Sequence, residues 1–280
     1  MKFVLVLQHK DLRQCDLEDL QHVLPAPPNY HFDYSVIRIP VHREFTIDEN
    51  MHHHLCQQKI DYAVLPDMAF ADLGLIVSDM DSTFITIECV DEIAAGVGLQ
   101  SQIAAITERS MRGEIDFENS LRERVALLKG LSIQQLQYVY DKILHLSPGA
   151  EWLIEQCRQH QVKFMLVSGG FTFFTDRLQQ QYHLDYAFAN ELAMSDGKLN
   201  GELCGRIIDA QAKADILNEY AAKFDLDKSQ ILAIGDGAND IPMLQSAGIG
   251  IAYHAKPKTE QAANICTRYG GLDTVRKWFR

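Results

Sequence analysis

The sequence has little positive charge, no long apolar run and no closely paired cysteines, and each absence excludes a class of protein. Its 280 residues carry 26 Lys and Arg against 38 Asp and Glu, a formal net charge of −12. The basic surface of a protein that binds nucleic acid or an acidic membrane is therefore missing, and we expect neither partner. Hydrophobic residues make up 47% and charged residues 23%, which is typical of a folded globular chain.

The six cysteines are widely spaced, without a C-x-x-C pair. This spacing predicts reduced thiols rather than a disulfide framework or a zinc site. The apolar run at residues 3–7 is too short for the core of a signal peptide or for a membrane span. We therefore expect a cytoplasmic protein.

Residues 1–72 combine short apolar runs with turn signals, a pattern typical of a small α+β domain. Strands are expected at 3–7, 34–39 and 60–65, a helix at 16–23, and a proline-rich link at 25–28. Three consecutive histidines at 52–54 point in different directions on a helix, so we interpret them as an exposed face rather than a metal site.

Residues 73–280 contain continuous apolar runs, each followed by a polar loop and helix-like sequence, at 73–77, 162–167 and 231–234. Such alternation predicts an α/β fold with a doubly wound, Rossmann-like parallel sheet, which binds ligands beyond the carboxyl ends of its strands. Residues 87–146 show only helical periodicity. We interpret them as a helical cap inserted into a core formed by residues 73–86 and 147–280.

Asp79 and Asp81 directly follow the first of these apolar runs. Alternation places both carboxylates on the same side of an extended chain. Two such anions repel one another unless a cation or proton lies between them, so the pair indicates Mg²⁺ binding, acid–base chemistry, or both. A calcium loop is disfavoured, because Thr83 and Phe84 stand where its third ligand and glycine would be.

Three further polar segments lie at strand ends or helix starts. The Ser-Gly-Gly sequence at 168–170 offers a hydroxyl and open backbone N–H groups, which suit a phosphate. Lys213 opens a helix, where a lysine taken alone is more often a surface residue. The Gly-Asp-Gly-Ala-Asn-Asp sequence at 235–240 supplies two carboxylates, although by itself it also fits a structural turn.

In this order, the Asp-x-Asp-x-Thr, Ser-Gly-Gly, Lys and Gly-Asp-Gly-x-x-Asp segments resemble the four motifs of the haloacid dehalogenase (HAD) superfamily of phosphohydrolases. The segments IECVDEIA (87–94), FENSLRERV (117–125), VSGGF (167–171) and YAFAN (186–190) resemble the phosphoserine phosphatase family within it. The resemblance implies Mg²⁺-dependent hydrolysis of O-phospho-L-serine to L-serine and phosphate, the last step of serine biosynthesis. Residues 1–72 resemble a degraded ACT-like amino-acid-binding domain only loosely.

The resemblance also implies a chemical role for each matched carboxylate. Asp79 would be the nucleophile that forms an aspartyl-phosphate. Asp81 would be the general acid that protonates the leaving serine oxygen and then the base for the attacking water. Carboxylates of Asp79 and Asp236, with the backbone carbonyl of Asp81, would hold Mg²⁺. Asp240 would support the metal or Lys213.

The resemblance implies that the phosphoryl oxygens bind to Ser168, the Gly169 N–H and Lys213. The serine part would be bound by Asn239 and by Glu88, with Glu88 on its ammonium group. The serine carboxylate would be bound by Arg124. Arg124 falls on the same side of a predicted helix as an apolar stripe, and an inward arginine needs an anionic partner. From the residues alone, two structural interpretations are as good as substrate binding. Arg124 would extend past the apolar edge into solvent, and Glu88 would only favour the first turn of a helix. Phe117 would shield the site from water or simply pack in the core.

Two other functions stay open at this point. The same site would suit another small phosphate ester, or transfer of the phosphoryl group to an alcohol. A non-catalytic amino-acid sensor is a hypothesis of a different class, although the complete set of chemical residues argues against it. Exposed strand edges in residues 1–72 favour a homodimer.

Overall fold

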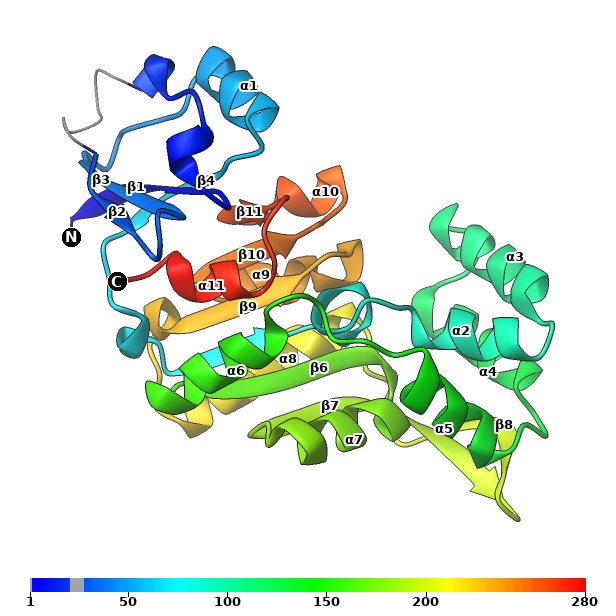
Figure 1. The fold of residues 1–280 in the computed structure, drawn as a ribbon. Coiled ribbons are helices and arrows are strands. Elements are labelled where there is room, and N and C mark those ends of the chain that lie inside the picture. Colours follow the sequence, from blue (N-terminus) through cyan, green and yellow to red (C-terminus); the bar gives the residue numbers. More distant parts are fainter. Residues whose placement is uncertain (1, 21–27) are drawn as a thin grey trace.

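The computed structural model describes residues 2–20 and 28–280, and they contain two β-sheets (Figure 1). The first sheet is antiparallel, in the order β2-β3-β1-β4. Its strands are β1 (Phe3–Gln8), β2 (Tyr30–His31), β3 (Val36–Val41) and β4 (Asp61–Pro66), and α1 (Glu49–Gln57) precedes β4. Asp48 caps α1 by accepting a hydrogen bond from the Met51 N–H at 2.8 Å.

Two details of the first domain differ from the sequence expectation. Over residues 16–20, where the helix expected at 16–23 would begin, the structure has the short 3₁₀ turn Glu18–Leu20, and another such turn, Leu12–Gln14, precedes it. Residues 21–27, which include the rest of that expected helix and most of the proline-rich link, lie outside the described part. The expected strand at 34–39 begins two residues later, because Tyr34 has a positive φ of 67° and belongs to a turn.

Strand β1 is buried on both faces, although it belongs to a small sheet. Leu5 and Leu7 pack toward α1, in an apolar cluster confined to residues 1–72. Val4 and Val6 point to the opposite face and join the main apolar cluster, which also contains Phe279. Because side chains alternate between the two faces of β1, this strand packs against α1 on one face and against the C-terminal part of the chain on the other.

The second sheet has seven strands in the order β11-β10-β9-β5-β6-β7-β8. All neighbours pair in parallel except β7 and β8, which form a hairpin. The strands are β5 (Leu75–Ser78), β6 (Lys163–Phe171), β7 (Tyr186–Ser195), β8 (Lys198–Cys204), β9 (Ile231–Gly235), β10 (Ile249–Tyr253) and β11 (Ile265–Thr267). The predicted α/β class with a parallel sheet is confirmed.

Helices cover both faces of this sheet. Residues of α6 (Ala150–Gln159), α7 (Thr172–Tyr182) and α11 (Asp273–Lys277) pack in the main apolar cluster on one face. Residues of α8 (Ala210–Lys223) and α9 (Ile241–Ser246) form a separate cluster on the other. The short helix α10 (Pro257–Glu260) lies between β10 and β11. Burial on both faces explains why the central strands read as continuous apolar runs.

Four helices lie between β5 and α6 in the chain and extend to one side of the sheet (Figure 1). They are α2 (Cys89–Gly96), α3 (Gln100–Met111), α4 (Phe117–Leu127) and α5 (Ile133–Lys142). We call residues 87–146 the cap. The β7–β8 hairpin reaches across to it, since Leu199 in β8 exchanges backbone hydrogen bonds with Gly130 and Leu131, both at 2.8 Å.

The two sheets meet edge to edge, where β4 contacts β11. At this junction the carboxylate of Asp61, the first residue of β4, accepts hydrogen bonds from the backbone N–H groups of residues 268–270, at 2.8 to 3.1 Å. One outer edge of the first sheet is therefore covered by the rest of the chain. In the described residues, every helix falls short of the length and apolar character needed to cross a membrane.

Candidate active site

Asp79 lies at the carboxyl end of β5, where the chain leaves the sheet. Its side chain is buried, with the residue 4% exposed. The following turn spans Met80–Phe84, and Ser82 within it has a φ of 55°. This turn places Asp81 beside the end of β6, because a Cβ added to Gly170 would lie 3.1 Å from Oδ2 of Asp81. The two aspartates thus both reach the same end of the sheet.

Lys213 is the cation of this site and is not a surface residue. It is 1% exposed and projects from the first turn of α8, whose N-terminus is capped by Asp209. Its Nζ donates to Oδ1 of Asp79 at 2.6 Å and to Oδ1 of Asp240 at 2.7 Å. Burial lowers the pKa of this ammonium, but the charges of Asp240 and Asp79 outweigh that effect and hold it above its usual value.

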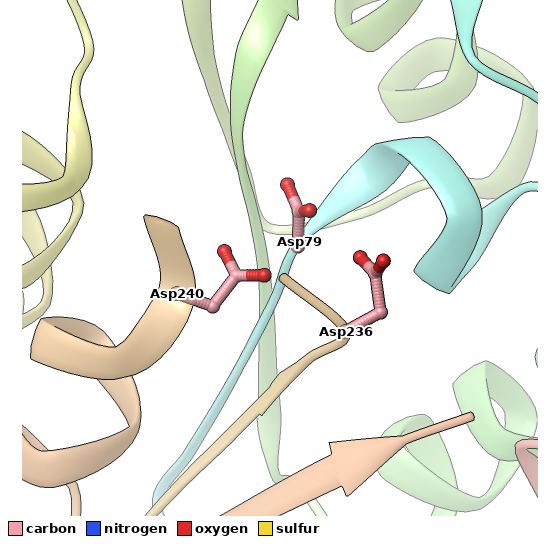
Figure 2. Close-up of side chains that lie close together, drawn as sticks. All are labelled: Asp79, Asp236 and Asp240. Atoms are coloured by element: carbon pink, nitrogen blue, oxygen red, sulfur yellow. The ribbon is translucent and has the colours of Figure 1, made fainter. Parts of the chain in front are cut away.

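The loop after β9 supplies the other two carboxylates. Asp240 is fully buried and accepts a second hydrogen bond, from the Gly237 N–H at 3.0 Å. Asp236 is half-buried and accepts from the hydroxyl of Thr83 at 3.2 Å. Figure 2 shows Asp79, Asp236 and Asp240 near one another, each on a different segment, and one oxygen of each lies within 4.8 Å of the others. Thr83 belongs to the Asp-x-Asp-x-Thr segment, but its hydrogen bond to Asp236 was not predicted from the sequence.

This acidic group fits a divalent cation. Three carboxylates against the single ammonium of Lys213 leave an excess of negative charge in a largely buried place. Burial, followed by the charge of Asp240, raises the pKa of Asp79 well above its usual value. Burial and the same neighbour raise the pKa of Asp236 to about 6. A bound cation relieves this repulsion, and carboxylate oxygens are the ligands that Mg²⁺ prefers.

Within the group, the aspartates differ in their free oxygens. Asp240 has both oxygens engaged, by Lys213 and by the Gly237 N–H. Among the described residues, the side chains of Asp79 and Asp236 each accept a hydrogen bond on Oδ1 alone, so each keeps Oδ2 available to a cation or a phosphate. Asp240 is therefore better suited to hold Lys213 than to bind a metal itself.

Asp81 is poised to carry a proton near neutral pH. One of its oxygens, Oδ1, is buried without a hydrogen-bond partner in the part of the chain that the structure describes. Burial, with a further contribution from the charge of Glu88, raises the pKa of Asp81 to about 7. A carboxyl group in this condition suits general acid and base chemistry.

The end of β6 forms a second wall of the site. Ser168 is 1% exposed, and its Oγ accepts a hydrogen bond from the Gly170 N–H at 2.9 Å. Gly169 lies against the cap, since a Cβ added there would come within 3.2 Å of Cζ of Phe117. Phe117, the first residue of α4, thus covers the Ser-Gly-Gly segment at the end of β6.

Asn190 is a supporting residue whose role was not foreseen. It is fully buried in β7. Its amide nitrogen donates to the carbonyl of Gly169 at 2.9 Å, and its oxygen accepts from the Ile208 N–H at 2.7 Å. It therefore ties the Ser-Gly-Gly segment of β6 to the segment that leads into α8 and Lys213. Its segment carried part of the family resemblance, which was the only available signal.

The cap supplies Arg124, near the carboxyl end of α4. The described residues offer its guanidinium no ion pair, and its Nε donates only to the Ser120 carbonyl at 3.3 Å. Burial lowers its pKa, whereas the charges of Asp91, Glu88 and Asp81 act in the opposite direction. A half-buried arginine without an anionic partner would suit an anion.

Glu88 and Asn239 lie at the margin of the site. Glu88 is exposed just before α2 and accepts a hydrogen bond from the Ser82 hydroxyl at 2.7 Å. Asn239 is half-buried in the 3₁₀ turn Ala238–Asp240. Ser82 lies in the turn that also carries Asp81, so Glu88 is held next to the predicted acid–base residue.

Comparisons with known proteins agree with this geometry. The family model for haloacid dehalogenase-like hydrolases matches residues 73–248. A phosphoserine phosphatase from Polaromonas sp. is 47% identical over 215 residues, which cover 75% of this chain and 91% of that protein. The chain belongs to the haloacid dehalogenase-like hydrolases, in the phosphoserine phosphatase family.

Two solved structures resemble nearly the whole chain. A HAD family hydrolase from Salmonella enterica serovar Typhi is 32% identical with a TM-score of 0.86, covering 98% of this chain and 97% of its own. A probable phosphoserine phosphatase from Vibrio cholerae, unliganded, is 37% identical with a TM-score of 0.82, covering 98% of this chain and 84% of its own. Both similarities include residues 1–72 as well as the hydrolase part.

Proposed function

We propose that this chain hydrolyses O-phospho-L-serine to L-serine and phosphate, with Mg²⁺ as its metal. The observation that carries the proposal is the buried Asp79, bonded to Lys213 and placed next to Asp236 and Asp240. The similar proteins named phosphoserine phosphatase support the choice of substrate. Asp79, Asp236 and the backbone carbonyl of Asp81 would hold the cation, whose charge lets the anionic nucleophile and the phosphate approach one another.

The chemistry proceeds in two displacements on the residues already described. The carboxylate of Asp79 attacks phosphorus, and the bond from phosphorus to the serine oxygen breaks as Asp81 gives that oxygen its proton. Asp81, now ionised, then takes a proton from a water that attacks phosphorus of the aspartyl-phosphate. Phosphate leaves, Asp79 is a free carboxylate again, and Asp81 is again protonated.

Binding groups surround the reacting phosphorus on both sides. Ser168, the Gly169 N–H and Lys213 would bind phosphoryl oxygens, where charge has to be stabilised during transfer. Arg124 would bind the serine carboxylate, Glu88 its ammonium, and Asn239 would contact the substrate. The guanidinium of Arg124, which has no ion pair within the described residues, is the feature that favours a substrate with a carboxylate.

The test is phosphate release from L-phosphoserine, compared with phosphothreonine, glycerol phosphate and p-nitrophenyl phosphate, with Mg²⁺ and with EDTA. We expect a preference for phosphoserine that needs Mg²⁺ and is lost in Asp79→Asn. An added alcohol acceptor such as homoserine reports phosphotransfer in the same assay. Preference for another ester would overturn the substrate, and inactivity toward all of them would favour the sensor hypothesis.

For the assembly, we propose that residues 1–72 are an ACT-like domain that forms a homodimer through the outer edge of β2 and β3. The other outer strand, β4, contacts β11, which leaves the β2 side for pairing. Light scattering at micromolar concentration should give twice the chain mass of 31.7 kDa; a monomeric mass contradicts the proposal. We further propose a cytoplasmic location, which suits cysteines that are all free in the structure.

A further inference from the structure

Strand β6 bulges where the residues proposed to bind phosphate lie. In its pairing with β7, Val167 lies opposite Phe188 and Phe171 lies opposite Asn190. These pairs are four positions apart in β6 but only two apart in β7, so the extra residues fall in the Ser-Gly-Gly segment at 168–170. A bulge interrupts the backbone hydrogen bonds between neighbouring strands. The peptide groups of this segment therefore have to be oriented by other contacts.

The two glycines of the bulge make this need greater. A Cβ added to Gly169 would lie 3.2 Å from Cζ of Phe117, and one added to Gly170 would lie 3.1 Å from Oδ2 of Asp81. Both approaches are tight, which favours glycine at the two positions. Glycine, however, has more backbone freedom than any other residue. Rigidity at the end of β6 consequently has to come from hydrogen bonds to its peptide groups.

The peptide group between Gly169 and Gly170 is held at both ends. Its carbonyl, which belongs to Gly169, accepts a hydrogen bond from Nδ2 of Asn190 at 2.9 Å. Its N–H, which belongs to Gly170, donates to Oγ of Ser168 at 2.9 Å. Because this Oγ accepts from the peptide group, the hydroxyl keeps its own proton to donate to a phosphoryl oxygen. Asn190 thus orients the Ser168 hydroxyl through a single peptide group.

The side chain of Asn190 also reaches the segment before α8. Its Oδ1 accepts from the Ile208 N–H at 2.7 Å, and its Nδ2 makes a long second hydrogen bond to the Ile208 carbonyl at 3.5 Å. The next residue, Asp209, caps α8, whose first turn carries Lys213. Asn190 is fully buried, so water does not compete for these bonds. One amide therefore joins the two parts of the chain that supply the proposed phosphate-binding groups.

We propose that Asn190 is a positioning residue for phosphate binding. It does not touch the substrate, but it fixes the Gly169–Gly170 peptide group and the start of α8, so that Ser168 and Lys213 meet the same phosphoryl group. Its loss weakens phosphate binding and largely spares Mg²⁺ binding, because the carboxylates that would hold the cation follow β5 and β9. This inference rests on the proposed function, which assigns the phosphoryl oxygens to these groups.

The test compares the wild type with Asn190→Leu, whose side chain has a similar size but no polar atoms. Inorganic phosphate is titrated calorimetrically into the full chain with saturating Mg²⁺, and Mg²⁺ is titrated separately without phosphate. Hydrogen exchange of the Gly170 N–H, followed by NMR without metal or phosphate, reports on the peptide group directly. Val162→Ala is the control, because Val162 is 3% exposed and lies just before β6, at the end of the strand opposite to Ser168.

Asn190→Leu should bind phosphate about tenfold more weakly than the wild type and should bind Mg²⁺ within about twofold of it, because a small misplacement affects only the groups that are misplaced. The Gly170 N–H should exchange faster in this variant. Val162→Ala should be less stable but should keep all three properties. Unchanged phosphate affinity or unchanged exchange in Asn190→Leu would overturn the proposal. Equal losses of phosphate and Mg²⁺ affinity would also overturn it, since they indicate a general structural role.

Asn190→Ser decides the question if Asn190→Leu does not fold. Its shorter side chain cannot reach both the Gly169 carbonyl and the Ile208 N–H, so the same selective loss of phosphate affinity is expected, and its absence would overturn the proposal. The wild type separates this inference from the proposed function. A wild type that binds phosphate but does not hydrolyse phosphoserine contradicts the proposed function alone, whereas one that binds no phosphate contradicts both.

Discussion

The ammonium of Lys213 lies 2.6 Å from Oδ1 of Asp79, although 134 residues separate the two in the sequence. The same ammonium lies 2.7 Å from Oδ1 of Asp240. One buried cation thus fixes the predicted nucleophile to the loop after β9. The position of Asp79 consequently depends on α8, a helix that follows both the cap and the β7–β8 hairpin in the sequence.

Replacing Lys213 by alanine should destabilise the metal-free protein by about 3–5 kcal/mol, because two buried carboxylates lose their cation. The free energy of unfolding in urea with EDTA measures this loss. Lys142→Ala, at an exposed position in α5, is the control and should change it by less than about 0.5 kcal/mol. Equal stability of the two variants would show that the buried ion pairs contribute little.

Gly235→Ala and Gly96→Ala should have opposite effects on stability. A Cβ at Gly235 would lie 2.5 Å from Cβ of Asp240, so Asp240 has to move away from Lys213. We expect a loss of about 1–3 kcal/mol and a matching loss of phosphate release. A Cβ at Gly96, in α2, meets nothing within 4 Å and should stabilise by about 0.5–1 kcal/mol. Full activity in Gly235→Ala would contradict the requirement for this close approach.

Arg124→Ala should lower kcat/KM for phosphoserine by about two orders of magnitude, because the substrate carboxylate loses its charged partner at a half-buried position. O-phosphoethanolamine has the ammonium but no carboxylate, so its kcat/KM should hardly change. Arg122→Ala, an exposed neighbour on α4 that pairs with Glu118, serves as the control. A similar loss with both substrates would assign Arg124 to packing of the cap instead.

Asp61 should titrate above its ordinary value of 3.8, because burial outweighs the three backbone hydrogen bonds that favour its charged form. A raised pKa in the folded state means that stability from this group is complete below 3.8 and is lost as pH rises through the folded value. A carbon NMR titration of the Asp61 carboxyl measures the pKa directly. A value below 3.8 would show that the backbone donors dominate at the junction of the two sheets.

The difference in unfolding free energy between the wild type and Asp61→Asn gives an independent measurement. The other carboxylates largely cancel in this difference, which should fall as pH rises through the folded pKa of Asp61. A difference that rises with pH over the same range would contradict the predicted direction. Asp67→Asn, at a half-buried residue just after β4, serves as the control.

Much of the architecture could be predicted because its signals are local. The apolar runs that became β5, β6 and β9 are readable since central parallel strands are buried on both faces. The polar residues after them were expected to meet, because the carboxyl ends of parallel strands lie at one edge of a sheet. Asp79 and Asp236, from the ends of two neighbouring strands, do meet there.

Errors and omissions arose where local signals are weak or misleading. Tyr34 reads as the start of a strand, because an aromatic residue has high strand propensity, although its backbone is left-handed. No periodic pattern in the sequence indicates the contact between Asn190 and Gly169, because the two residues lie on different strands. The expected roles of the active-site residues stay predictions.

By itself, the sequence determined the class of fold and the strand ends that bear carboxylates, because both follow from hydrophobic patterns that repeat over a few residues. Its composition also excluded a basic binding surface. Only the tertiary structure decided that Lys213 is buried between two aspartates, that Phe117 covers Gly169, and that Asn190 joins the end of β6 to the segment before α8. Each of these features joins residues far apart in the chain. Such contacts arise from how sheets and helices pack on one another, and no local pattern encodes them.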